Sequence, residues 1–395
     1  MFRKIAVGIS GGVDSSVTAY LLKKKGYEVL GVYMRNWDIR DEQGTCSSDK
    51  DLKDAQTTCD FLNIPLVQVN FVKEYWNEVF LQFIDDYEHG FTPNPDILCN
   101  KFVKFNYFYK YARTKLNCDA IATGHYANTS FGNYLENYQQ GQHVKLLKAR
   151  DTTKDQTFFL SQIEERSLRK TFFPLGNMLK RDVKQYARKI GLQALADKKE
   201  SMGICFIGSR NFQHFISDYI VDQPGDFIDV DTGKVVGKHE GIHHWTIGQR
   251  AHLGGFSQAY FIAKRCFKNN IIYVAPGTNH PALHSSLFFT DQPHWISHDP
   301  LVQSNCFDCA FKFQHINDLS DCRVMQVEHG MVVRVNGVKR GLAPGQYAVF
   351  YKNEECLGSS RIISTGVTNF TLNMLEYLRR KSNQNQQTEQ THAYG

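Results

Sequence analysis

The segment Ser10-Gly-Gly-Val-Asp-Ser-Ser16 has the residue types of an anion-binding loop. Its glycines allow a tight backbone turn and a close approach to a ligand. The segment follows an apolar strand pattern and precedes a helical one, so amides at the start of the helix would face the ligand. Three serine hydroxyls add further donors. These features predict a loop that holds the phosphates of a nucleotide.

Two familiar kinds of nucleotide loop are excluded. The segment lacks the Lys-Ser/Thr ending of the Walker loop, and the chain has no Gly-x-Gly-x-x-Gly there. An ordinary P-loop NTPase and a dinucleotide oxidoreductase therefore do not fit. A plain glycine turn capped by Ser and Asp is the simpler alternative, and the complete heptad between strand and helix argues against it. Asp14 is placed to help hold Mg²⁺.

A second reactive segment runs from Thr92 to Asn100 and reads Thr-Pro-Asn-Pro-Asp-Ile-Leu-Cys-Asn. Two prolines predict a rigid, extended loop between two helices. Such a loop would present Asn94, Asp96 and Cys99 from a stiff support. Cys99 is expected beside the N-terminus of the following helix, where the dipole lowers the pKa of a thiol. Lys101 and Lys104 would add to this effect.

The other cysteines give weaker signals. Cys205 lies in an apolar stretch closed by glycines, and by itself it reads as a buried strand cysteine. Cys59 and Cys118 are expected to be packing residues. Cys306 and Cys309 form a Cys-x-x-Cys without a second pair at zinc-ribbon spacing, so no structural metal is expected. Ten cysteines without a secretory signal indicate a reducing compartment.

The elements that would position these residues alternate between strand and helix in the first half. The predicted strands are Ile5–Ile9, Tyr27–Met34, Leu66–Val69 and Ala120–Thr123. The predicted helices are Val17–Lys25, Asp51–Leu62, Glu74–Glu88 and Lys101–Leu116. Such alternation predicts an α/β fold with a parallel sheet, whose ligands lie at the carboxyl ends of the strands.

The second half has a different character. Asn128–Gln142 reads as an irregular excursion, and a helical pattern returns at Arg181–Ile190. From Ile271 onward, short β-rich runs alternate with turn residues, which predicts a small antiparallel barrel or sandwich. These runs are Ile271–Ala275, Met331–Val335, Gln346–Tyr351 and Arg361–Ser364. The polar end, Lys381–Gly395, is expected to be disordered.

Length and composition set the outer bounds. A chain of 395 residues predicts two or three domains, and 42% hydrophobic with 22% charged residues is typical of a globular protein. No apolar run approaches the roughly 20 residues of a membrane helix, so no membrane partner is expected. The net charge of +6 is only a weak hint of a polyanionic partner.

Seven ordered motifs make the chain similar to a known family. They are the loop at Ser10, Thr92–Asn100, Ala122–Ala127, Lys154–Gln156, Gly203–Gly208, Gly248–Arg250 and Pro344–Tyr351. Together they resemble the tRNA-specific 2-thiouridylases, a family of the ATP pyrophosphatase (PP-loop) superfamily. The resemblance covers Lys4 to Ile363.

The resemblance implies an order of domains. A parallel-sheet ATP pyrophosphatase domain, of the adenine nucleotide alpha hydrolase-like kind, is expected over residues 1–208. A small central tRNA-binding domain would span 209–279, and an antiparallel β-barrel 280–372. Residues 373–395 would form a disordered tail.

The family replaces the 2-oxygen of the wobble uridine of tRNA with sulfur. The resemblance implies that ATP adenylates this oxygen, giving AMP and pyrophosphate overall. Cys205 would carry sulfur as a persulfide, and Cys99 would act as the nucleophile that frees it, with a transient Cys99–Cys205 disulfide or released sulfide. Asp96 would shuttle protons at the base. A stacked base hides its reactive carbon, so the uridine is expected to be flipped out.

The resemblance also assigns binding residues. Those for ATP are Gly8, Ile9, Ser10, Gly11, Gly12, Val13, Asp14, Ser15, Met34 and Gly124. Those for the target base or tRNA are Asn94, Pro95, Asp96, His125, Lys154, Asp155, Gln156, Phe313, Gln314 and Gln346. Relatives commonly carry a basic residue after the aromatic at Phe313, whereas this chain has Gln314 there and Lys312 before it. A phosphate contact at this point is therefore either moved to Lys312 or lost.

Two other functions remain open from the sequence. An ATP pyrophosphatase of a small metabolite would share the loop, as argininosuccinate synthase and GMP synthetase do, and a catalytically inactive tRNA-binding module is the other candidate. The paired cysteines and the C-terminal barrel argue against the first candidate. The presence of Asp14, Cys99 and Cys205 argues against the second. A protein of a persulfide relay is expected to deliver the sulfur.

The expected location is the mitochondrion, with a bacterial-type cytoplasm as the alternative. Glu200–Gly203 and the absence of a Gly-rich insertion after Gly255 resemble the mitochondrial branch. One observation argues against the mitochondrion. Met1–Lys4 is expected to lead almost directly into the first strand, with no room for an ordinary transit peptide.

Overall fold

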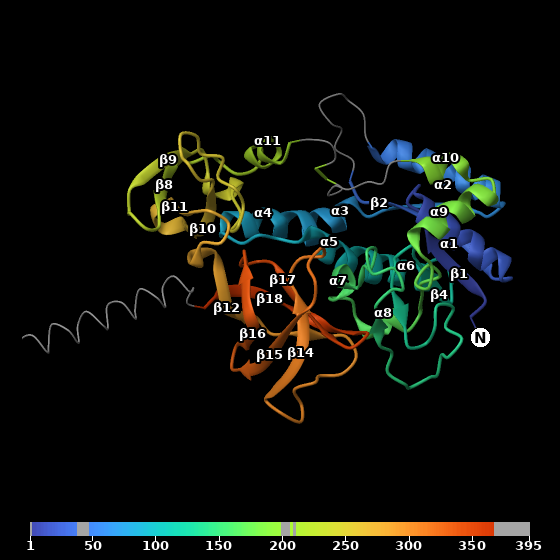
Figure 1. Cartoon of the computed structure of the whole chain (residues 1–395). Coiled ribbons are helices and arrows are strands. Elements are labelled where there is room, and N and C mark those ends of the chain that lie inside the picture. The colour runs from blue at the N-terminus through green and yellow to red at the C-terminus, as the bar shows by residue number, and fades with distance from the viewer. Residues whose placement is uncertain (1, 38–46, 199–205, 208–210, 367–395) are drawn as a thin grey trace, which may run out of the picture.

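A five-stranded parallel sheet organises the N-terminal part of the chain (Figure 1). The computed structural model describes residues 2–37, 47–198, 206–207 and 211–366. The strand order is β3-β2-β1-β4-β7, and every pairing in this sheet is parallel, which confirms the predicted α/β fold. The strands are β1 (Lys4–Gly8), β2 (Glu28–Arg35), β3 (Leu66–Asn70), β4 (Ala120–Ala122) and β7 (Thr171–Phe172).

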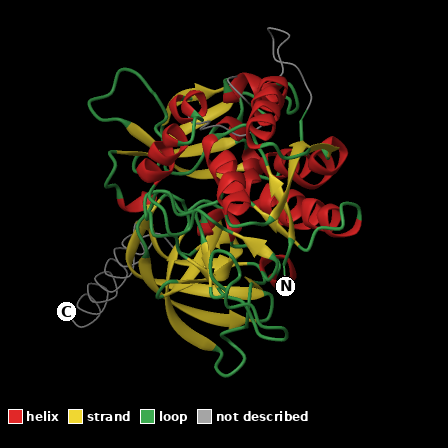
Figure 2. Cartoon of the chain, turned by 90° about the vertical axis from the view of Figure 1, so that its right-hand side faces the viewer, coloured by secondary structure: helices red, strands yellow, loops and turns green. Residues whose placement is uncertain are grey.

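Helices lie beside these strands (Figure 2). Residues Ile5, Ala6 and Val7 of β1 are fully buried, as an unbroken apolar run in a strand covered on both faces should be. Several of the segments that connect the strands are helical as well. The helices outside the two long rods described below are α1 (Val13–Lys24), α2 (Ser47–Leu62), α7 (Thr157–Leu160), α8 (Glu165–Leu168), α9 (Lys180–Lys189), α10 (Gln193–Asp197) and α11 (Phe212–Ser217).

One long helical rod leaves the sheet and reaches the central part of the molecule (Figure 1). It consists of α3 (Val72–Tyr75), the π-helical turn η1 (Trp76–Phe80) and α4 (Leu81–Glu88). The predicted aromatic helix is confirmed and begins two residues earlier than expected. Its fully buried aromatic side chains, Phe80 and Phe83, pack against Phe206, which anchors the rod in the core.

A second rod replaces the predicted extended loop. Helix α5 (Pro95–Leu98) continues into η2 (Cys99–Tyr107) and α6 (Phe108–Thr114). The prediction that Thr92–Asn100 is extended throughout is therefore wrong beyond Asn94. Proline is well tolerated at the first helical position because its missing N–H would be unpaired there, so Pro95 starts a helix here.

A four-stranded sheet forms the central part, with the order β10-β11-β8-β9. Its strands are β8 (Gly225–Asp229), β9 (Val235–His239), β10 (Tyr260–Cys266) and β11 (Ile271–Pro276). The β-rich pattern grouped Ile271–Ala275 with the C-terminal barrel, and this grouping is wrong, whereas the resemblance had assigned the same run to the central domain over 209–279. Strand β11 pairs with β10 and β8, and its Ile272 and Val274 are buried in the core of the central sheet.

The C-terminal part is a closed antiparallel barrel, as predicted. Strand β12 pairs with both β16 and β18, which closes the ring through β15, β14 and β17. The strands are β12 (His284–Thr290), β14 (Cys306–Lys312), β15 (Ser320–Val327), β16 (Gly330–Arg340), β17 (Tyr347–Lys352) and β18 (Glu355–Thr365), with β13 (His294–Trp295) beside β18.

The barrel sheet continues into the N-terminal part. Strand β6 (Leu146–Leu147) pairs with β18, and β5 (Asn128–Thr129) pairs with β6. Part of the predicted irregular excursion therefore extends the barrel sheet. Each helix among the residues that the structure describes is too short or too polar to span a lipid bilayer. The predicted tail, residues 373–395, lies outside the described residues.

Candidate active site

The loop between β1 and α1 has the geometry of an anion site. Gly12 caps α1 without a side chain, so the amides of the first helical turn remain available to a ligand. Gly11 has φ +73°, and a Cβ there would lie 2.4 Å from the carbonyl oxygen of Asp51. Ser15 Oγ donates to the carbonyl of Gly12 at 3.0 Å and accepts from the amide of Ser10 at 3.2 Å. The loop is thus preformed by its own hydroxyl network.

Two other strand ends meet this loop. A Cβ on Gly124, after β4, would lie 2.8 Å from the amide nitrogen of Ser15, so only glycine fits at this approach. Met34, near the end of β2, lies beside Gly8, where an added Cβ would meet its Cε at 3.3 Å. The residues predicted to bind nucleotide therefore gather at the carboxyl edge of the sheet, where parallel folds place ligands.

The carboxylate of Asp14 has two partners. Its Oδ1 accepts from the hydroxyl of Tyr126 at 2.9 Å, and its Oδ2 lies 2.6 Å from Nζ of Lys180. Lys180 is the first residue of α9, and its side chain is 12% exposed. Sequence reasoning did not find this lysine, because no motif surrounds it. A positive charge here suits a phosphate-binding site.

A second lysine holds the outer side of the loop. Lys198 Nζ donates to Asp51 at 2.9 Å, to Asp54 at 2.6 Å and to the carbonyl of Gly11 at 3.3 Å. Burial acts to lower the pKa of Lys198, but the hydrogen bonds to the two carboxylates outweigh burial and raise it. Lys198 precedes Cys205 by seven positions, so the described chain reaches the loop shortly before the predicted persulfide residue. Cys205 itself lies outside the described residues.

The start of the second rod positions Asp96 and Cys99. Asn94 Oδ1 accepts from the amide of Ile97 at 3.2 Å and so caps the helix. Asp96 is open to solvent on one side, yet burial by the surrounding protein raises its pKa, and the positive charge of Lys104 opposes this shift. A raised pKa favours a carboxyl group that exchanges protons near neutral pH.

Cys99 lies deeper in the helix than predicted. It is 4% exposed and begins η2, one turn after the helix starts at Pro95. The expectation that it lies beside the helix N-terminus is therefore wrong, and the dipole argument, whose effect falls off within the first turn, does not apply to this thiol. Lys101 donates to Gln162 Oε1 at 3.0 Å, and burial lowers its pKa.

The central sheet and the barrel both form hydrogen bonds with the segment that precedes this helix. Arg265 of β10 donates to the carbonyl of Gly90 at 2.8 Å and to Thr92 Oγ1 at 3.2 Å. Gln346 Nε2 donates to the carbonyl of Thr92 at 3.0 Å. Gly345 has φ +95°, and a Cβ there would lie 2.4 Å from the amide nitrogen of Thr92. All three parts of the molecule thus meet at Thr92.

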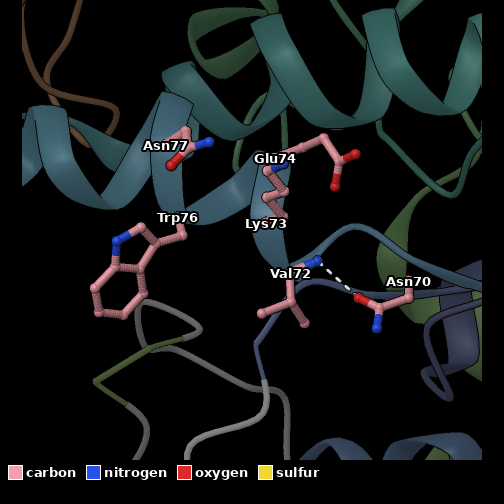
Figure 3. Close-up of a pocket in the computed structure, with 6 residues that line it drawn as sticks. All are labelled: Asn70, Val72, Lys73, Glu74, Trp76 and Asn77. Carbon is pink, nitrogen blue, oxygen red and sulfur yellow. Dashed lines mark hydrogen bonds between the residues drawn. The ribbon is translucent and has the colours of Figure 1, made fainter.

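A pocket opens at the carboxyl end of β3 (Figure 3). Asn70 Oδ1 accepts from the amide of Val72 at 3.0 Å and shapes the turn into α3. Trp76 forms one wall and stacks on Trp37 with ring centroids 5.4 Å apart. Strand β2 separates this pocket from the loop after β1, so it borders the same edge of the sheet at a distance from Asp14.

The comparisons with known proteins agree on one family. Residues 3–209 match the model described as "tRNA methyl transferase HUP domain", 213–276 its "PRC-barrel domain", and 285–362 "Aminomethyltransferase beta-barrel domain". The chain is 52% identical over 368 residues to "Mitochondrial tRNA-specific 2-thiouridylase 1" of Drosophila melanogaster, which covers 92% of this chain and 95% of that protein.

Two further relatives carry similar names. The Homo sapiens protein of the same name is 46% identical over 390 residues, 94% of this chain and 92% of that protein. "tRNA-specific 2-thiouridylase MnmA" of Malacoplasma penetrans is 43% identical over 374 residues, 91% of this chain and 98% of that protein. The chain belongs to the tRNA-specific 2-thiouridylase family.

The residues predicted to contact tRNA fall into two groups in this structure. One group is buried and used within the protein. His125 packs against Phe105 and Phe173, and burial, with a smaller effect of Lys104, holds its pKa well below the usual value. Asp155 accepts from the amide of Ala149 at 2.9 Å and is 4% exposed. Phe313 is 3% exposed in the barrel core.

The other group lies nearer the surface. Gln314 is exposed, and Lys312 is half-buried, with its Nζ 3.4 Å from the carbonyl of His315. Gln156 Oε1 accepts from the amide of Tyr126 at 3.0 Å, which joins the Lys154–Gln156 segment to the residue that contacts Asp14. The RNA contacts of both groups stay predictions.

The four other cysteines that the sequence analysis named lie in the core or on a strand of the barrel. Cys59 and Cys118 are buried, as predicted, and burial raises the pKa of Cys59 to about 11. Cys306 and Cys309 are three positions apart on β14, so they point to opposite faces of the strand. Cys309 instead faces Cys322 of β15, with the two sulfurs 3.6 Å apart.

Proposed function

We propose that this protein is a tRNA-uridine 2-sulfurtransferase that makes 2-thiouridine at the wobble position of tRNA. The observation that carries the proposal is the preformed loop at the carboxyl edge of the sheet, with Asp14 at its centre, in a chain 52% identical to a named 2-thiouridylase. The loop holds ATP through the amides of the first turn of α1 and the hydroxyls of Ser10 and Ser15.

The first step is adenylation of the uridine. The 2-oxygen of the base attacks the α-phosphorus of ATP, and pyrophosphate leaves. Lys180 lies beside Asp14, and Lys198 contacts the carbonyl of Gly11. Their positive charges border the loop and would neutralise the charge of the phosphates. Asp14 offers the carboxylate oxygens that Mg²⁺ prefers, and the ion would supply further charge neutralisation at the phosphates.

The second step is transfer of sulfur. A relay protein loads Cys205 with a persulfide, and the thiolate of Cys99 attacks the inner sulfur of this persulfide. Hydrosulfide leaves, attacks C2 of the base and displaces AMP, and a Cys99–Cys205 disulfide remains for a thiol reductant to open. Asp96 accepts and returns the protons at the base, and its raised pKa supports this role.

The three parts of the molecule share the tRNA. We assign residues 1–208 to catalysis, 209–279 to a central tRNA-binding domain and 280–372 to a barrel that meets the anticodon arm. The supporting observation is the meeting of all three at Thr92, two residues before Asn94. Backbone contacts dominate such binding, so tRNA affinity should fall steeply as salt rises. We place the protein in mitochondria, as the names of two animal relatives suggest.

The decisive experiment is a thiolation assay. The protein is incubated with ATP, Mg²⁺, a persulfide donor and tRNA with a wobble uridine, and the digested tRNA is analysed for 2-thiouridine. Cys99→Ser and Cys205→Ser should each abolish the product and keep ATP binding, whereas Cys118→Ser, a buried control, should keep the activity. Wild type that yields no 2-thiouridine, where a bacterial relative does, would refute the proposal.

A further inference from the structure

Three side chains converge where the central sheet meets the chain from α11. Asp222 follows α11, while His243 and His244 belong to the short 3₁₀ helix η3 (Ile242–His244). Nε2 of His244 lies 2.7 Å, and Nε2 of His243 3.0 Å, from the same Oδ1 of Asp222. One ligand atom from each residue lies within 4.8 Å of the others.

The two imidazoles are buried and incompletely paired. Each histidine side chain is 5% exposed, and their ring centroids are 4.2 Å apart. His244 hydrogen-bonds to Asp222, whereas Nε2 of His243 is buried without a hydrogen-bond partner although it points at the same oxygen. Buried polar atoms normally have partners, so this nitrogen indicates a missing ligand.

The surrounding residues keep this arrangement in place. A Cβ on Gly241 would lie 2.5 Å from Cε1 of His243 and 3.1 Å from Oδ1 of Asp222, so glycine is required for the close approach. Ser217 Oγ donates to the other carboxylate oxygen, Oδ2, at 3.2 Å. Hydrogen bonds of this kind orient the ligands of a metal.

We propose that Asp222, His243 and His244 bind a divalent transition-metal ion, with Zn²⁺ as the occupant. Two imidazole nitrogens and one carboxylate oxygen are a donor set that suits zinc. Bonds of about 2.0–2.1 Å in a tetrahedron separate the ligand atoms by roughly 3.3 Å. The two histidine–aspartate distances, 3.0 and 2.7 Å, therefore need to open by roughly 0.3–0.6 Å. Asp222 is 37% exposed, which leaves the fourth position to water.

No structural metal was expected from the sequence, because Cys306 and Cys309 lack a second pair at zinc-ribbon spacing. Two adjacent histidines with an aspartate 22 positions before His244 match no common zinc pattern.

The ion would fix α11 to the central sheet. Phe215 of α11 packs against Phe206 and Phe80, so α11 also touches the long rod of the catalytic part (Figure 1). Zinc bound after α11 would therefore join the central sheet to a helix that packs on Phe206 of the catalytic part. The site is separate from the nucleotide loop, and its role is to hold these parts together.

The test is zinc binding by the full chain. Metal-free protein is titrated with ZnCl₂ in a calorimeter, and the zinc-loaded protein is studied by X-ray absorption at the zinc edge. We expect one equivalent bound with a Kd of about 1 µM or lower and nitrogen and oxygen ligands that include two imidazoles. Zinc should also raise the melting temperature by several degrees.

Variants then locate the ion. His243→Gln/His244→Gln should lose one equivalent, and Asp222→Asn should weaken binding at least tenfold. His280→Gln is the matched control, because His280 pairs with Asp231 at 3.1 Å in the same part of the chain without a second histidine, and it should bind zinc like wild type. Equal zinc binding by the double variant and wild type, or a sulfur-only ligand shell in wild type, would overturn the proposal. If the double variant does not fold, the ligand shell of wild type and the affinity of Asp222→Asn decide.

Discussion

The ammonium group of Lys180 lies 2.6 Å from Oδ2 of Asp14, although the two residues are 166 positions apart in the chain. The aspartate belongs to the first turn of α1 and the lysine to the first turn of α9, so both helix N-termini face the same place. Two positive helix ends and a lysine around one carboxylate form a site with a surplus of positive charge. A polyphosphate is the ligand that this surplus favours.

Replacing Lys180 tests this relationship. Lys180→Met keeps most of the side-chain volume and removes the charge, so Asp14 loses its ion pair and the phosphates lose a neutralising partner. We expect ATP binding or the rate of thiolation to fall about 10- to 100-fold, the range of a charged hydrogen bond of about 1.5–3 kcal/mol. Calorimetry with ATP and single-turnover thiolation measure the two effects.

The control is a lysine on the same helix. Lys189 is exposed at the other end of α9, and Lys189→Met should change neither quantity more than twofold. Unchanged ATP affinity and unchanged rate in Lys180→Met would show that Lys180 only balances the charge of Asp14.

Gly124 offers a steric test of the nucleotide site. A methyl group there would lie 2.8 Å from the amide nitrogen of Ser15 and 2.9 Å from the carbonyl carbon of Asp14. Gly124→Ala must therefore push the first turn of α1 aside, at about 1–3 kcal/mol, and we expect ATP affinity to fall on the order of 10- to 100-fold. Equilibrium ATP binding is the measurement.

Gly254→Ala is the matched control, because a Cβ at Gly254 meets nothing within 4 Å. It should bind ATP as wild type does. Normal ATP binding by Gly124→Ala would contradict the prediction and would mean that the chain after β4 can move away from the loop.

Much of the catalytic part was predictable from sequence because its signals are local. The strands β1–β4 are short apolar runs, and the loop at Ser10 carries its own glycines and hydroxyls. The roles of Lys180 and Lys198 were missed because they come from the tertiary fold. Each lysine stands in a polar stretch without a motif of its own, and only packing brings it to Asp14 or Gly11.

Of two wrong predictions, one has a local cause and the other a cause distant in sequence. Pro93 and Pro95 were both taken as signs of an extended loop, but proline at the first helical position starts a helix when Asn94 caps it. The run Ile271–Ala275 has the composition of any buried strand, and composition does not say which sheet it joins. Partner strands are chosen by contacts distant in sequence.

Gln346 has two possible roles that kinetics can separate. Its side-chain amide donates to the carbonyl of Thr92 at 3.0 Å. Gln346 therefore fixes the backbone that leads to Asn94 and Asp96. We expect Gln346→Ala to lower the single-turnover rate about 3- to 10-fold, the effect of one hydrogen bond of about 1 kcal/mol, and to leave tRNA affinity within twofold. Gln303→Ala, at an exposed barrel position, should change neither. A loss of affinity at an unchanged rate would instead support direct contact with tRNA.

The pKa of Asp96 leads to a prediction about pH. Burial raises this pKa above its usual value, and the positive charge of Lys104 limits the rise. If the carboxylate form is needed to accept a proton, the rate must fall as pH drops through the raised pKa. Lys104→Met removes the opposing charge, so the pKa rises further and the acid limb of the rate profile should move to higher pH. Single-turnover thiolation between about pH 5 and pH 9 measures this limb.

Two variants make the prediction specific. Lys110→Met, exposed on the same rod, should leave the acid limb where it is. Asp96→Asn cannot titrate and should lose the limb together with most of the rate. A limb that moves to lower pH in Lys104→Met, or that persists in Asp96→Asn, would assign the titration to another group, because removing a positive charge can only make a nearby carboxyl group harder to ionise.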